Sequence, residues 1–139
     1  MHPRQTIRER IFVELTNHMP GVNVFMSLKR PLEQQDKPAV LVRGFSESVQ
    51  IGSMRDLSQE RTYQIQVAVF AESENEADDL AKMVEIALAN PQSLKLLQAE
   101  ISLTDISINQ EQNEHRDCSV IMGYTVIYSA TGNVLSLVS

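Results

Sequence analysis

The sequence has one cysteine, Cys118, among its 139 residues, so no disulfide can form within the chain. The fold is therefore expected to rest on packing and hydrogen bonds, which suits a reducing compartment. Long apolar runs are also missing: the longest, such as Val67–Ala71, are far shorter than the roughly 20 residues of a membrane span. The charged start, MHPRQTIRERIF, lacks the apolar segment of a secretory signal, so neither membrane insertion nor export is expected.

An excess of basic residues is missing as well. Twelve Lys and Arg face 18 Asp and Glu, and the pI is about 5.0, whereas a domain that binds polyanions usually has a high pI. Direct readout of nucleic acid is therefore disfavoured. The charge is uneven, because residues 1–43 carry seven basic and four acidic side chains and residues 44–139 carry five and fourteen. Opposite charges on two faces of a subunit would let identical copies meet head to tail.

Strong catalytic and nucleotide-binding motifs are absent, since GxxxxGK[ST], HExxH and GxSxG do not occur. His115 and Cys118 have the spacing of half a metal site, but a structural zinc needs four ligands. A Cys118 nucleophile would use His115 as its base, without a third group to orient it. We expect no catalytic residue, cofactor or metal. A small α+β ligand-binding or enzymatic domain that uses His115 and Cys118 is kept as an alternative.

Two amphipathic helices are predicted. The first covers residues 6–19, after Pro3 in its first turn, and stops at Pro20-Gly21. The second starts at the capping box of Ser73 and Glu76. It ends at Asn90-Pro91. One further helical turn is expected shortly after this point.

Arginines gather at the start of the first helix, at Arg4, Arg8 and Arg10. Such residues can contact phosphate. Because the chain is acidic overall, we favour a solvated helix face for Arg8 and Glu9 instead.

Five strands are predicted, and one of them alternates clearly, with Tyr63, Ile65, Val67 and Val69 on its apolar face. In the fourth strand the apolar phase changes between Leu103 and Ile106, which indicates a bulge. A polar turn at 110–117 makes the last two strands an antiparallel hairpin. The order of elements predicts an α+β fold, a mostly antiparallel sheet of about four to five strands with two helices packed on one face. The strands cover residues 22–26, 39–45, 61–70, 101–109 and 119–129.

The length and composition predict a single domain over residues 1–139. Residues 46–60 are mostly polar and are expected to form a long loop between two strands. The C-terminal tail, residues 131–139, ends in apolar residues whose burial requires a partner element. Two places are open for it, a last edge strand or an arm that reaches another subunit.

Five segments have a familiar order and texture: RERIFVEL, PAVLVR, RTYQIQVAVFAE, ENEADDLAKMVEIAL and SVIMGYTVIYSAT. Together they resemble the tail terminator proteins of long-tailed phages. The likeness covers roughly residues 4–130 and is greatest to the lambda-type minor tail protein that caps the finished tail tube. It lies in element order and residue texture, without a catalytic signature.

The resemblance implies a non-enzymatic structural protein of a phage or prophage. It implies a subunit that is often monomeric when free and forms a homo-hexameric ring on the tail tube. The ring stops tube polymerisation and presents the surface that joins the head connector protein. The expected places are the virion tail and, during assembly, the host cytoplasm. A neck or head-completion protein is a close alternative.

Within this interpretation, the 46–60 loop is the leading candidate for contact with the tail tube protein or a neighbouring subunit. Met54, Arg55 and Asp56 are its candidate contact residues. A solvent-exposed loop without such a contact is an equal alternative for these three residues.

Overall fold

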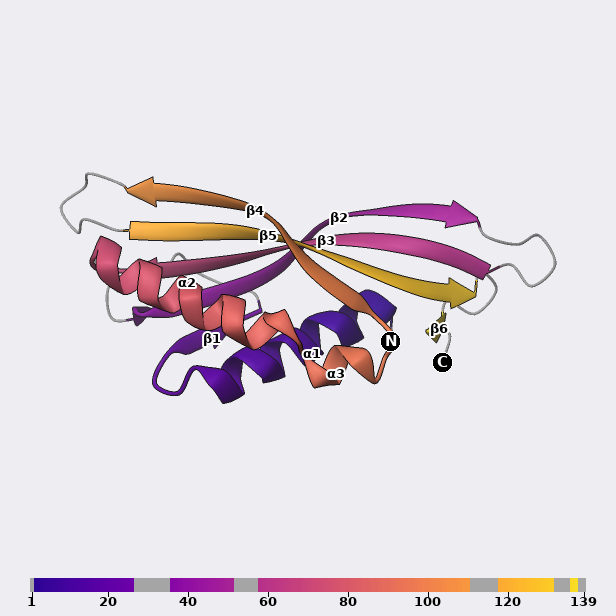
Figure 1. Ribbon diagram of the computed structural model, residues 1–139, viewed down its shortest axis with the longest axis horizontal. Helices are drawn as coiled ribbons and strands as arrows, with labels where there is room; N and C mark the ends of the chain where they lie inside the picture. The colour runs from indigo at the N-terminus through magenta and orange to yellow at the C-terminus, as the bar shows by residue number, and fades with distance from the viewer. Residues whose placement is uncertain (1, 27–35, 52–57, 111–117, 132–135, 138–139) are drawn as a thin grey trace.

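The chain forms one twisted sheet with all of its helices on the same face (Figure 1). The computed structural model describes residues 2–26, 36–51, 58–110, 118–131 and 136–137. No helix in these ranges is both long enough and apolar enough to cross a membrane. The elements are α1 (Pro3–His18), β1 (Asn23–Phe25), β2 (Ala39–Ile51), β3 (Ser58–Ala71), α2 (Glu74–Ala89), α3 (Gln92–Lys95), β4 (Glu100–Gln110), β5 (Cys118–Thr131) and β6 (Ser136–Leu137).

The strands lie in the order β1-β2-β3-β5-β4, and β6 pairs with the end of β5. Only β1 and β2 are parallel among the described pairs; the others are antiparallel. The predicted α+β fold is confirmed, as are the β4–β5 hairpin and a bulge, which shifts the register between Leu103 and Asp105. The pairing of β6 with β5 agrees with the edge-strand alternative for the C-terminal tail.

Helix α1 has Pro3 in its first turn, as predicted, and His2 caps it. The His2 Nδ1 atom accepts a hydrogen bond from the Arg4 N–H at 3.1 Å, and Gln5 Oε1 accepts one from the His2 N–H at 2.9 Å. Pro3 takes the first helical position, where its missing N–H leaves no bond unmade. Burial of the ring and, after it, the charge of Arg4 lower the pKa of His2, which keeps Nδ1 available as an acceptor.

The core lies between the helices and the sheet. Ile7, Ile11 and Leu15 of α1 have no exposed surface. Alternate residues of β3 and β5 are buried against the helices, so the predicted apolar face of β3 is confirmed. The largest fully buried side chains of the core include Ile65, Leu88, Leu94, Met122 and Tyr128.

The start of α2 confirms the serine half of the predicted capping box. Ser73 Oγ accepts a hydrogen bond from the Glu76 N–H at 3.2 Å. We expect Ser73→Ala to lower the free energy of unfolding by about 1 kcal/mol, because that N–H loses its partner. Urea unfolding followed by circular dichroism measures this, with Ser48→Ala, at an exposed strand position, as the control. Equal stability of the two variants would contradict the role of the cap.

The predicted loop at residues 46–60 is wrong over much of its length. Strand β2 continues to Ile51 and β3 already begins at Ser58. Glu47, Val49 and Ile51 alternate with polar neighbours, which is a strand pattern that the prediction overlooked. It was overlooked because a register shift next to Phe45 moves the inward-facing positions by one residue. Residues 52–57, with the candidate contacts Met54, Arg55 and Asp56, lie outside the described residues.

Candidate interaction surfaces

A buried carboxylate joins the start of α1 to the sheet. The side chain of Glu47, in β2, is 6% exposed. Its Oε2 accepts hydrogen bonds from Nη1 of Arg4 at 2.5 Å and Nη1 of Arg61 at 2.9 Å, and its Oε1 accepts one from the hydroxyl of Tyr128. Gln59 Oε1 accepts two more from Arg61, at 3.1 and 2.8 Å. These five residues, here called the Glu47 cluster, connect α1, β2, β3 and β5.

The strand register explains why these side chains meet. Arg61 of β3 lies opposite Tyr128 of β5 on one side and opposite Val49 of β2 on the other. Glu47 lies two residues along β2 from Val49, on the same face, within reach of the long Arg61 side chain. The first turn of α1 then brings Arg4 over the carboxylate.

The cluster is held in one protonation state at neutral pH. Burial alone would raise the pKa of Glu47, but hydrogen bonds from Tyr128, Arg4 and Arg61 outweigh it and lower the pKa below its usual range. Burial, and after it the bond to Glu47, raises the pKa of Tyr128. Glu47 is therefore ionised and Tyr128 neutral. Two guanidinium groups face one carboxylate, so the cluster keeps a net positive charge.

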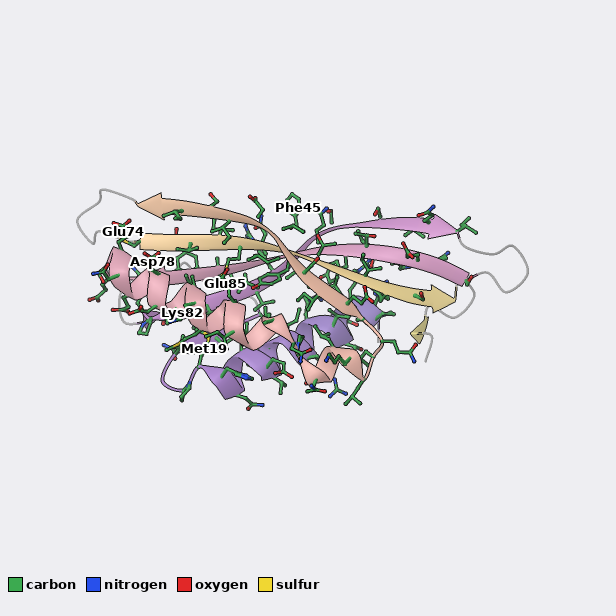
Figure 2. All side chains as sticks on the ribbon, viewed as in Figure 1. Met19, Phe45, Glu74, Asp78, Lys82 and Glu85 are labelled. Carbon is green, nitrogen blue, oxygen red and sulfur yellow. The ribbon has the colours of Figure 1, made fainter. Side chains whose placement is uncertain are left out.

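A shallow depression lies beside the cluster, where α1 meets β2. Arg8 Nη1 donates a hydrogen bond to the hydroxyl of Tyr63 at 2.6 Å, which ties a second turn of α1 to the sheet. The depression has a volume of about 280 Å³, and Phe45 at its rim is 68% exposed. Figure 2 places Phe45 on the side of the sheet away from the helices. The lining residues are Arg4, Arg8, Gly44, Phe45, Ser46, Glu47 and Tyr63.

The structure tests some of the residues singled out in the sequence. Arg8 is not simply on a solvated helix face, because its guanidinium bonds Tyr63. Glu9 and Arg10 are exposed, as expected. Cys118 is the first residue of β5 and only 5% exposed, whereas His115 lies outside the described residues. No group of three His, Cys, Asp or Glu that could hold a metal occurs in the described part of the chain.

Glu47 and Arg61 were not recognised from the sequence as a site. Glu47 falls within the segment that was expected to be a loop, and Arg61 is the first residue of a predicted strand. A charged side chain at either place is normally solvated. One signal was available: Glu47, Val49 and Ile51 alternate with serine and glutamine, which is the pattern of a strand. The pairing of Glu47 with Arg4 had no such signal, because the two residues are 43 positions apart in the chain.

The three described helices cover one face of the sheet, and no described helix lies on the other face (Figure 1). Arg43 of β2 lies on this face, where its Nη2 donates a hydrogen bond to Gln66 Oε1 at 3.3 Å. Most of the other side chains on this face are uncharged hydroxyls and amides. The face is therefore polar with few charges, and the strand register adds three carboxylates to Arg43, namely Glu60, Glu100 and Asp105. The hydroxyls and amides include Ser48, Thr62, Gln64, Gln66, Ser102, Ser107, Thr125 and Ser129.

A solved structure with a similar fold is known. One chain in the structure titled "Virion of native gene transfer agent (GTA) particle" superposes with a TM-score of 0.52. The match covers 89% of this chain and 95% of that chain, at 8% sequence identity. The likeness therefore extends over nearly the whole of both chains and shows a shared fold. No protein-family model and no curated protein sequence matches the chain.

Proposed function

We propose that the chain is a phage or prophage tail terminator. It assembles as a six-membered ring on the tail tube, stops tube polymerisation and provides the surface that joins the head. The observation that carries this proposal is the shared fold, end to end, with a chain of a virion particle. The sequence resemblance to tail terminators, in five segments spread over the same length, supports it independently.

Two features of the subunit are compatible with such a role. Helices cover one face of the sheet and leave a hydrated, weakly charged face open to a partner (Figure 1). Among its described residues, that face lacks the row of Lys and Arg that tight binding to a phosphate backbone requires. Nucleic acid that passes such a surface would not be held by it.

Loss of the protein is expected to give tails of abnormal length. Without a cap, tube subunits keep adding and heads find no joining surface, so electron microscopy of the deletion strain should show long, headless tubes. Expression of the protein from a plasmid should restore normal tails. Tails of normal length that still join heads in the deletion strain would contradict the proposal.

Co-sedimentation separates this function from its alternatives. A tail terminator sediments with purified tail tubes in the absence of heads. A neck or head-completion protein sediments instead with head connectors in the absence of tubes. The contact residues proposed at Met54, Arg55 and Asp56 are tested in the same assay by their joint replacement with alanine. Cys118→Ser would abolish activity only if the small ligand-binding or enzymatic alternative were correct.

A further inference from the structure

Two surfaces with apolar centres lie at opposite edges of the sheet. The first surface, the α2–β4 surface, lies at the edge formed by β4. Leu103, Ile106 and Ile108 lie opposite buried residues of β5 and so share the face that the helices cover, yet they are 37, 47 and 63% exposed. Asp78 and Glu85 lie on the flank of α2 toward β5 and β4, as Figure 2 shows.

The α2–β4 surface is acidic and lies at a sheet edge that no further described strand covers. Helix α2 carries five carboxylates against one lysine over Glu74–Ala89. Strand β4 ends the strand order and contains neither proline nor lysine, the residues that usually keep a sheet edge from pairing with another chain. Exposed apolar side chains beside such an edge mark a place for a partner.

The second surface, the α1–β2 surface, lies at the other edge of the same sheet. Val49 and Ile51 follow Glu47 along one face of β2, and they are 48 and 63% exposed. At the start of α1, Arg4 bonds Glu47 and Arg8 bonds Tyr63, which lies opposite Glu47, so the Glu47 cluster leaves an excess of positive charge at this end of the surface. This surface therefore has an apolar centre with a basic border.

We infer that the α2–β4 surface of one copy of the chain docks on the α1–β2 surface of a second copy. The two surfaces are complementary, because their apolar centres can bury each other and their borders carry opposite charge. Within one copy the two lie at opposite edges of the sheet, with β3 and β5 between them. They can only meet between copies, in a head-to-tail contact that closes into a ring when the rotation is right. The inference rests on the proposed function for the ring and assigns its subunit interface.

A mixing experiment tests this pairing. Ile51→Glu disables the α1–β2 surface and Ile106→Glu the α2–β4 surface, and both positions are exposed enough to accept a charge without unfolding. At a concentration where the wild type self-associates, sedimentation should find each variant alone to be monomeric. Their equimolar mixture should form two-chain species, because each variant keeps one good surface for the other. Leu96→Glu, at a position that is 82% exposed in α3, should assemble as the wild type does.

Other outcomes overturn the inference. If either variant alone forms dimers, the contact pairs a surface with itself, and if the mixture stays monomeric, the two surfaces do not meet. A wild type that is monomeric at all concentrations and forms no rings on tubes also refutes it. Asp78→Lys should weaken wild-type association by at least tenfold at low salt and by less at high salt, because screening removes the charge contribution. Failure of the proposed function gives a different result. The deletion strain would then have normal tails, while the two variants would still pair in the mixture.

Discussion

Glu47→Gln is expected to lower the free energy of unfolding by about 3 kcal/mol at pH 7. Removing one partner of a buried ion pair costs about 3–5 kcal/mol, because the remaining charge has no compensation. Arg61, which is 8% exposed, is that charge here. The amide can still accept hydrogen bonds, which places the effect at the lower end of this range. Guanidinium unfolding monitored by circular dichroism measures the change.

The same variant has an expected pH dependence. Because the pKa of Glu47 is lowered in the folded protein, the carboxylate stabilises the fold above the unfolded pKa of about 4.3. This contribution is lost as the pH falls through the lower, folded pKa. Glu47→Gln has no such titration, so its deficit should shrink over that acid range. Glu60 is an exposed carboxylate on β3, and Glu60→Gln should change the stability and its pH profile much less than Glu47→Gln does. An equal loss in the two variants would contradict the role of the cluster.

Local patterns explain why much of the fold could be predicted. The alternation around Val67 and the helical spacing around Ile11 depend only on near neighbours in the chain, and both were confirmed. The bulge near Leu103 was also visible, because the apolar phase changes within one strand. At Phe45 the same kind of change was missed, since a glutamate occupies the first inward position after it.

The Glu47 cluster could not be predicted because its members are far apart in the chain. Glu47 meets Arg4 across 43 residues and Tyr128 across 81. Either charge alone is typical of a solvated surface, and only the tertiary fold pairs them. The α2–β4 surface has the same origin. The carboxylates of α2 are visible in its sequence, but only the strand order places β4, with exposed Ile106, at an edge of the sheet.

Gly44→Ala is expected to destabilise the protein by about 1–3 kcal/mol, the range for adding a methyl group to a packed site. A Cβ atom at residue 44 would overlap the Tyr63 hydroxyl and lie 2.8 Å from Cζ of that ring. The ring has little freedom to move away, because Tyr63 is 2% exposed and its hydroxyl accepts the bond from Arg8. Gly123→Ala is the matched control, since its Cβ would meet its nearest atom, Asp105 Cβ, at 3.3 Å.

A double-mutant cycle tests whether the overlap with Tyr63 is the cause. Tyr63→Phe alone removes the hydrogen bond from Arg8 and should cost about 0.5–1.5 kcal/mol. In the Gly44→Ala/Tyr63→Phe variant the overlapping oxygen is gone, so the loss should be smaller than the sum of the two single losses by about 1 kcal/mol. The Cζ contact remains, which is why rescue should be partial. Strictly additive losses in urea unfolding would mean that the methyl group does not touch the ring. The position of Tyr63, which ties α1 to the sheet, would then not require a glycine at residue 44.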